Sequence, residues 1–373
     1  MENFNKQTEQ ENFIKYWDKV INLWLAEPEE REDSEVIDAR RPLPEKKKTK
    51  KKEEEEDKKE CYYKEGFEVN MENEQMAFFN NEKLKKLLCP AHLPEPYWGN
   101  PYKDKCSIVV VDYNPAGGTD MNPHSYKGTI DGKQFPSNTI IKYVKENRYS
   151  NFATNFPIWK KDLPKGMEWL CSYGGRNWWL KKKEWIQHLV GDNIKVEEVP
   201  PFAIELCGWH SPNWPDNTDA FQGEGLKETI KNRFALPLLE AIDNSKSHLA
   251  ICIGAQFKPS ILKKFLPDLV NITGCIFDED KLGGEGICYP DNPGKKDIPG
   301  DESISVTINK DKKETTRYYR VYDVKGEGEN NHHIILNTFA PGSNHHPAKE
   351  YWDFENKLIE AIKLWKTGNN TSK

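Results

Sequence analysis

Four short apolar runs of this chain each end in polar residues that are able to bind a ligand. Each run is five or six residues long, as in a buried strand, and the four are Ser107–Val111, Phe202–Leu206, His248–Ile253 and His333–Thr338. The polar residues at or after their ends are Asp112, Asn114, Glu205, His210, Gln256, Ser343, Asn344, His345 and His346. Carboxylates, imidazoles and amides brought to one place can orient water and transfer protons.

The elements that must position these residues alternate between strand and helix. Helices are predicted over Ser137–Glu146, over Gly225–Ile242 with a break at Pro237, and over Glu350–Trp365. This alternation predicts an α/β fold with a central four-stranded parallel sheet flanked by helices. Ligands bind beyond the carboxyl ends of parallel strands, so we expect the polar residues to gather at one edge. The residues after Val111 are also common turn formers, which leaves an ordinary turn as the alternative.

Composition separates an N-terminal segment and a charged linker from a globular body. Residues 1–43 begin with a predicted amphipathic helix over 9–26, whose Trp stripe suits docking onto the body, and continue as an acidic stretch. Residues 44–60 are blocks of Lys and Glu that cannot form a core, so we expect a solvated linker. A contact of its basic half with phosphate groups is the alternative. The body is predicted to span residues 62–367.

An insertion is predicted in this body over residues 275–328. Two alternating runs, Ser303–Asn309 and Arg317–Val324, flank a charged tip and predict a β-hairpin. The sequence shows no internal repeat, no Gly-rich phosphate loop, no GxGxxG after a strand and no GxSxG elbow. These absences argue against a nucleotide hydrolase with a phosphate loop, a dinucleotide-binding enzyme and a serine hydrolase of the elbow type.

Bulk composition favours a cytoplasmic protein without metal or cofactor. No apolar run approaches the ~20 residues that span a membrane, and the N-terminus lacks a signal-peptide pattern. The eight cysteines form no CxxC pair, so we expect reduced, mostly structural thiols. Distant cysteines that assemble a metal or cluster site are the alternative, as are the pairs His332-His333 and His345-His346.

The charge balance leaves room for a nucleic-acid partner. The net charge is −6, and the first 60 residues, with 14 Lys and Arg against 18 Asp and Glu, account for −4 of it. The remainder is therefore close to neutral, and a local basic face is allowed. Aromatic and basic residues alternate at Trp159-Lys160-Lys161 and over 178–183, a mixture that suits phosphate contact and base stacking. A solvated helix face over 178–190 is the alternative.

Over roughly residues 90–365 the chain resembles the uracil-DNA glycosylase superfamily. The resemblance rests on four features that occur in order along the chain. They are Pro96–Pro101 before a strand that ends in Asp112-Tyr113-Asn114-Pro115, Glu205 in the second strand, Ile253–Gln256 after the third, and Ala340–Pro347 after the fourth. The resemblance implies a three-layer α/β sandwich and an enzyme that flips a nucleotide out of the DNA stack and excises its base.

The family's first motif assigns a role to Asn114. An amide has no useful basicity, so Asn114 would position the attacking water rather than deprotonate it. Asp112 is the nearest carboxylate able to act as a base, and capping of the turn is its alternative role. Tyr113, Phe152 and Phe156 are the aromatic residues expected to bind the flipped base, although both phenylalanines also suit a core.

Glu205 is the most informative departure from uracil-specific sites. A carboxylate accepts a hydrogen bond from an exocyclic amine, so Glu205 would favour a cytosine-like or amino-bearing modified base. The alternative is an outward-facing strand residue paired with a lysine.

The family's second motif has diverged in this chain. The motif normally carries His before Pro-Ser, and here that position is Ala340. His345 or His346 would then supply the histidine that stabilises the departing base. Contacts with the DNA are expected from six residues, namely Gly342, Ser343, Asn344, Gln256, Lys160 and Lys161.

These features predict a DNA glycosylase that hydrolyses the N-glycosidic bond of a damaged or modified pyrimidine. The enlarged loops suggest a specialised substrate, such as a modified base in foreign phage DNA. The expected partner is DNA, duplex or single-stranded, with no membrane contact and no indicated protein partner. A non-catalytic nucleic-acid-binding protein on the same fold and a hydrolase of free nucleosides or nucleotides are the alternatives.

Overall fold

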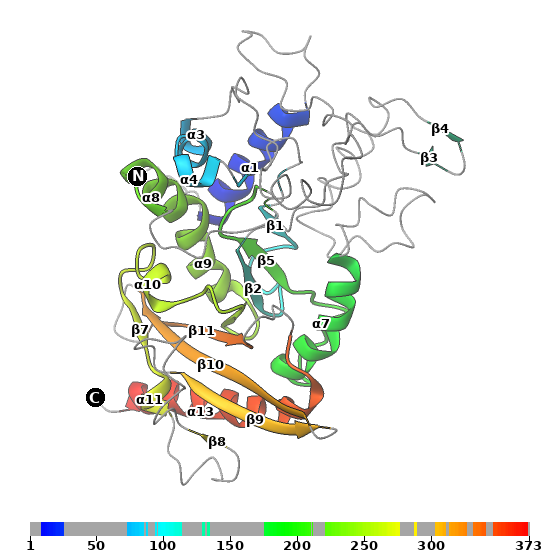
Figure 1. Cartoon of the computed structure of the whole chain (residues 1–373), viewed down its shortest axis with the longest axis vertical. Helices are drawn as coiled ribbons and strands as arrows, with labels where there is room; N and C mark the ends of the chain where they lie inside the picture. Colours follow the sequence, from blue (N-terminus) through cyan, green and yellow to red (C-terminus); the bar gives the residue numbers. More distant parts are fainter. Residues whose placement is uncertain are drawn as a thin grey trace, which may run out of the picture. The chain divides into compact units, whose positions relative to one another are not determined.

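A computed structural model of the chain shows a mixed α/β protein (Figure 1). The structure describes residues 9–25, 73–85, 87–88, 94, 96–113, 129–130, 133–134, 175–209, 211, 221–276, 287–288, 303–310, 313–326, 331–340 and 346–371. The helix predicted over Ser137–Glu146 and the linker over 44–60 lie outside these residues. Among the helices described, none has the length and apolar character needed to cross a membrane.

Within the described residues the main sheet has nine strands, in the order β1-β5-β2-β6-β11-β10-β9-β8, with β7 paired to β10. Their bounds are β1 Tyr97–Trp98, β2 Val109–Asp112, β5 Phe202–Glu205, β6 Leu249–Ile253, β7 Leu269–Asn271, β8 Ile287–Cys288, β9 Ile304–Lys310, β10 Lys313–Lys325 and β11 His332–Phe339. Strand β6 is parallel to both β2 and β11. The pairs β1–β5, β10–β11, β9–β10, β8–β9 and β7–β10 are antiparallel. A separate two-stranded ribbon joins β3 (Thr129–Ile130) and β4 (Lys133–Gln134).

The α/β class predicted from the sequence is confirmed, but the four-stranded sheet is wrong. All four predicted runs form strands: β2, β5, β6 and β11. The predicted hairpin also forms, as β9 and β10, but it joins the same sheet because residues 318–325 of β10 pair with β11. The free backbone groups on that side of β11 need partners, and β10 supplies them. The hairpin is therefore part of the sheet rather than an appendage to it.

Helices occupy most of the remaining described chain. Their bounds are α1 Glu9–Leu25, α3 Asn73–Phe79, α4 Glu82–Lys85, α7 Gly175–Val190, α8 Glu224–Ile230, α9 Leu236–Asn244, α10 Pro259–Leu262, α11 Thr273–Ile276 and α13 Trp352–Thr371, with a π turn η6 at Lys231–Ala235 and a 3-10 turn η7 at Lys349–Tyr351. The break predicted at Pro237 takes the form of η6. Proline lacks an N–H and its ring clashes with the carbonyl four residues earlier, and Leu236 N–H reaches back to the Lys231 carbonyl in the wider turn.

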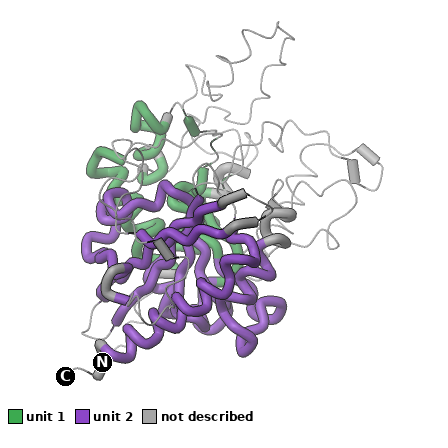
Figure 2. The backbone as a smooth tube through the Cα atoms, turned by 60° about the horizontal axis from the view of Figure 1, so that its bottom comes forward, with its two compact units in different colours: residues 1–100, 112–177, 203–237 green, residues 101–111, 178–202, 238–373 purple. Residues whose placement is uncertain are grey.

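The chain divides into two compact units (Figure 2). Unit 1 comprises residues 1–100, 112–177 and 203–237, and unit 2 comprises 101–111, 178–202 and 238–373. The division falls within the strands β2 and β5.

Unit 1 is organised around the N-terminal helix α1. Phe13 and Trp17 of this helix are almost fully buried, as the predicted aromatic stripe requires. The Phe13 ring lies 5.2 Å from that of Tyr97 in β1. The docking predicted for α1 is therefore observed, and its target includes the short strand β1.

Unit 2 has helices on both faces of its part of the sheet. On one face, Tyr319 of β10 contacts Phe354 of α13, with ring centroids 5.1 Å apart. On the other face, His333 Nε2 of β11 lies 3.0 Å from the Asp243 carboxylate of α9. Side chains alternate along a strand, and the register of β10 with β11 places Tyr319 and His333 on opposite faces of the sheet.

Candidate functional site

In unit 2 the ends of β6 and β11 are joined by an amide side chain. Asn337 is fully buried near the end of β11. Its Nδ2 donates to the carbonyl oxygens of Cys252 at 3.3 Å and Gly254 at 3.0 Å. The backbone adds a third bond, from Gly254 N to the Thr338 carbonyl at 3.0 Å. The turn that leaves β6 is therefore fixed to the last residues of β11.

This turn requires glycine at position 254. Gly254 has φ +127°, and a Cβ there would lie 2.4 Å from Gln256 Oε1. The Gln256 side chain thus folds back over the glycine. A larger residue would meet backbone strain at this φ, and the Gln256 side chain would have to move away. Gln256, which the sequence assigned to DNA contact, is held in this turn in a half-buried position.

A buried arginine supports the same turn from within the sheet. Arg320 of β10 is 1% exposed, and its Nη1 donates to Asn337 Oδ1 at 3.2 Å. The guanidinium carbon also lies 4.3 Å from the centre of the Phe339 ring. Arg320 and Asn337 were not predicted as site residues. The available signal was an amide inside the otherwise apolar run His333–Thr338.

On the other face of β11, Glu355 of α13 is completely buried. Its Oε2 accepts a hydrogen bond from Trp185 Nε1 at 2.8 Å, and its Oε1 accepts one from the Tyr319 hydroxyl at 2.9 Å. Burial raises the pKa of Glu355 to about 7, although Trp185, Tyr319 and Arg317 all favour the charged form. The carboxyl group is thereby poised to change charge near neutral pH.

Two further residues of unit 2, Arg317 and His346, connect Glu355 with the end of β11 and with the segment that follows it. Arg317 Nε donates to the Thr338 hydroxyl at 2.6 Å, and burial lowers the pKa of this arginine. The ring of His346 lies 6.1 Å from that of Trp185, at an interplanar angle of 33°. Trp185 therefore touches both Glu355 and a histidine that the sequence assigned to catalysis. We refer to Glu355, Trp185, Tyr319, Arg317 and Thr338 as the Glu355 cluster.

In unit 1 the ends of β2 and β5 lie side by side. Leu206 N donates to the Asp112 carbonyl and Cys207 N to the Tyr113 carbonyl, both at 2.9 Å. Asp112 and Glu205 are half-buried residues, and the Oε2 atom of Glu205 is buried. Tyr113 is 4% exposed, and its ring packs edge-on against Phe221 at 6.5 Å. The structure thus brings Asp112, Tyr113 and the end of the Glu205 strand together.

The residues that follow β5 are held by the helices of unit 1. A Cβ at Gly208 would lie 2.9 Å from both Pro96 Cβ and Trp17 Cη2, so only glycine fits beneath α1. Trp209 Nε1 donates to Gln75 Oε1 at 2.8 Å, and Gln75 Nε2 donates to the Tyr16 hydroxyl at 2.8 Å. The helices α1 and α3 therefore fix the chain immediately after β5.

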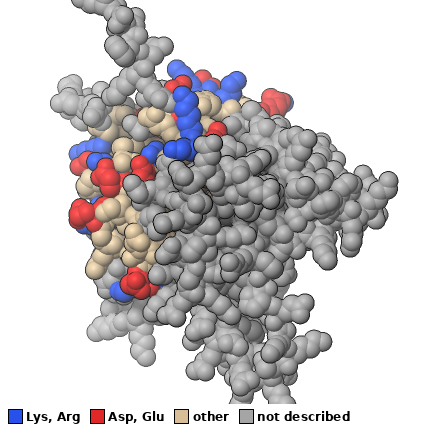
Figure 3. All heavy atoms as spheres, turned by 90° about the horizontal axis from the view of Figure 1, so that it is seen from above, with Lys and Arg blue, Asp and Glu red and all other residues tan. Residues whose placement is uncertain are grey.

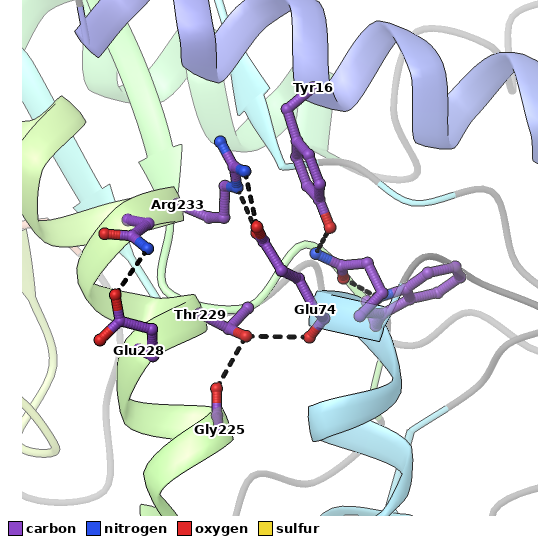
Figure 4. A network of polar contacts seen from close by, with 9 residues as sticks. Tyr16, Glu74, Gly225, Glu228, Thr229 and Arg233 are labelled. Carbon is purple, nitrogen blue, oxygen red and sulfur yellow. Dashed lines mark hydrogen bonds and ion pairs between the residues drawn. The ribbon is translucent and has the colours of Figure 1, made fainter.

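An ion pair anchors the same helices (Figure 4). The Arg233 guanidinium binds Glu74 through two contacts, Nε to Oε2 at 2.5 Å and Nη2 to Oε1 at 2.9 Å. It also lies 3.7 Å from the centre of the Tyr16 ring. The Thr229 hydroxyl reaches the Glu74 carbonyl at 3.0 Å. We call Tyr16, Glu74, Gln75, Thr229, Trp209 and Arg233 the Glu74 network.

Nine of the predicted site residues lie outside the described part of the chain. They are Asn114, Phe152, Phe156, Lys160, Lys161, Gly342, Ser343, Asn344 and His345. The structure describes Asp112, Tyr113 and Glu205 in unit 1, and Gln256 and His346 in unit 2. The roles assigned to all of these residues remain predictions.

Within the described residues, no group of three or more His, Cys, Asp or Glu side chains could hold a metal ion. Of the two histidine pairs considered as metal ligands, His332 and His333 each bind a separate carboxylate. His332 Nδ1 lies 2.8 Å from Asp323, and His333 Nε2 lies 3.0 Å from Asp243. The adjacent pair therefore diverges, as expected for neighbouring residues of a strand.

The face drawn in Figure 3 carries charges of both signs. Lys and Arg side chains lie interspersed with Asp and Glu over its described part. A nucleic-acid interface is marked by one-sided positive charge, and the described part of this face shows a mixture instead.

Comparisons of the chain with protein-family models, with curated proteins and with solved structures found no match.

Proposed function

We propose that the protein is a DNA glycosylase that removes a damaged or modified pyrimidine by hydrolysis. The observation that carries the proposal is the arrangement of β2, β6 and β11. Strand β6 runs parallel to both of the others, so all three end at the same edge of the sheet. Each of these strands leads into one of the sequence features that resemble the uracil-DNA glycosylase superfamily. The carboxyl edge of parallel strands is where such folds bind their ligands.

The proposed reaction breaks the bond between C1′ of the sugar and the base nitrogen. The bonding electron pair leaves with the base, positive charge builds on the sugar, and water adds its oxygen to C1′. Asn114 orients this water, and Asp112 is the carboxylate able to accept its proton. His345 or His346 donates a hydrogen bond to the base as negative charge develops on it.

Glu205 supports a base that carries an exocyclic amine. It stands at the end of β5 as a half-buried residue, and its Oε2 atom is buried. A carboxylate accepts from the N4 amine of cytosine, whereas uracil offers an oxygen at that position. Cytosine and its modified forms are therefore the proposed substrates.

The test is an assay for abasic sites with the full-length protein. Duplexes and single strands would carry uracil, mismatched thymine, cytosine, 5-hydroxymethylcytosine or glucosylated hydroxymethylcytosine. We expect abasic product from a cytosine-type base with wild type, and a loss of at least about 100-fold in Asn114→Ala, in line with removal of a group that positions a reactant. The control Asn232→Ala replaces a half-buried asparagine of η6 whose Nδ2 donates to Glu228 Oε1 at 3.0 Å, and it should retain activity.

Two outcomes would overturn the proposal. DNA binding without product on any of the substrates would favour a non-catalytic binding protein, in agreement with Ala340 at the position of the motif's histidine. Base release from free nucleosides but not from DNA would favour a nucleoside hydrolase.

A further inference from the structure

We infer that Glu355 is a positioning residue of the proposed site. Its carboxylate holds Trp185 in the orientation against which His346 packs. The inference rests on the proposed function, because His346 belongs to the segment that resembles the second motif. It adds a residue of α13 that lies outside every sequence feature of the resemblance.

The contacts of Glu355 give it control over Trp185. Both carboxylate oxygens are used, one by the Trp185 indole of α7 and the other by the Tyr319 hydroxyl of β10. All three side chains are fully buried. In a densely packed interior an indole bound at its N–H has few alternative orientations. The carboxylate therefore fixes the plane of the ring.

Trp185 in turn contacts His346, which lies in the segment that resembles the second motif. The His346 ring stands 6.1 Å from the indole and is tilted by 33° from its plane. His346 lies seven positions beyond the end of β11, whose residue Thr338 is held by Arg317. One buried cluster thus contacts both the end of the strand and the segment that follows it.

The groups that face Glu355 determine how it responds to protonation. Strand β10 contributes Arg317 and Tyr319, and α7 contributes the uncharged indole of Trp185. Tyr351 of η7 acts to raise the pKa of Arg317, against the larger lowering by burial. An ionised carboxylate accepts from both of its donors. Protonation converts one oxygen into a donor and weakens one of the two bonds. The hold on Trp185 should therefore weaken as Glu355 is protonated.

The direct test is the side-chain N–H resonance of Trp185 in ¹⁵N-labelled full-length protein, assigned by its absence in Trp185→Phe. We expect its chemical shift to change with an inflection near pH 7, to lose that inflection in Glu355→Gln, and to keep it in His346→Asn. An inflection that persists in Glu355→Gln but disappears in His346→Asn would identify the histidine as the titrating group and overturn the inference. This measurement needs no DNA, so its result does not depend on whether the protein has the proposed glycosylase activity.

The second test is a double-mutant cycle on base excision. Glu355→Gln keeps the shape of the side chain and should lower kcat about tenfold with little change in KM, as displacement of a catalytic group does. In a His346→Ala background the same substitution should have almost no further effect. The control is Glu360→Gln, on the exposed side of the same helix. Equal effects of Glu355→Gln in both backgrounds would show a purely structural role and overturn the inference.

Discussion

Glu74 of unit 1 and Glu355 of unit 2 perform similar tasks with different chemistry. Each carboxylate ties together elements that are distant in the sequence. The side chain of Glu74 is 39% exposed and binds the guanidinium of Arg233, a permanent cation. Glu355 is completely buried and binds the neutral donors Trp185 and Tyr319. The Glu74 network should therefore respond to salt, and the Glu355 cluster to pH.

The difference follows from the surroundings of each carboxylate. Solvent screens the partly exposed pair and limits its contribution to stability. Burial removes that screening but penalises the charged form, and the pKa of Glu355 rises to about 7 as a result. A buried carboxylate whose hydrogen-bond donors are neutral therefore lowers the stability of the fold when it is charged, and the stability then depends on pH.

The largest expected effect is the pH dependence of stability that Glu355 introduces. Its pKa is about 7 in the folded protein and about 4.5 as an isolated group, so the folded state binds more protons than the unfolded state between these values. The stabilisation is complete below pH ~4.5 and is lost as pH rises through ~7, a change of about 3 kcal/mol. Urea unfolding from pH 4.5 to 8 should show this loss in wild type and a smaller one in Glu355→Gln. If the free energy of unfolding changed with pH in the same way in both proteins, Glu355 would not be the group responsible.

A smaller effect is expected where α1 packs on Gly208. Gly208→Ala would place a methyl group 2.9 Å from Trp17 and Pro96, and should destabilise the protein by about 1–3 kcal/mol. The matched control is Gly225→Ala in α8, where the added Cβ meets only Ala77 at 3.9 Å. That change should be neutral or stabilising by up to about 1 kcal/mol. Trypsin should cleave Gly208→Ala faster at the exposed residues Lys15 and Lys19 of α1; equal cleavage of both variants would argue against docking through this contact.

The smallest effect is expected from Glu74→Gln. This change removes the charge from the bidentate pair with Arg233 and should cost about 1 kcal/mol or less, because Glu74 is partly exposed. The cost should shrink further at about 0.5 M salt, where such interactions are screened. Urea unfolding of both proteins at low and high salt measures this. A cost that does not depend on salt would mean that shape, rather than charge, holds Arg233.

The parts of the fold that local sequence specifies were predictable. The strands β2, β5, β6 and β11 follow from short apolar runs, and α1 follows from the spacing of its aromatic residues. The division of the helix before Pro237 follows from the chemistry of proline. The joining of the hairpin to β11 depends on tertiary pairing, which no local pattern in β9 or β10 specifies.

The Glu355 cluster could not be predicted because its partners are far away in the chain. Trp185 is 170 residues from Glu355 and Tyr319 is 36 residues from it. Glu355 stands within the predicted helix Glu350–Trp365, next to apolar positions. A carboxylate beside the apolar stripe of this helix was the only local signal. Of the proposed site, the sequence identified residues at the strand ends, but it did not identify Asn337, Arg320 or Glu355, which hold the segments beyond those ends.

The most direct test of the account is the release of free base from DNA. Wild type in excess over a duplex with a single cytosine-type base should release that base in step with the formation of the abasic strand, as measured by mass spectrometry. Asn114→Ala should release almost none, and Asn232→Ala should match wild type. Release at the wild-type rate by Asn114→Ala, or no release by any of the proteins, would contradict the glycosylase assignment.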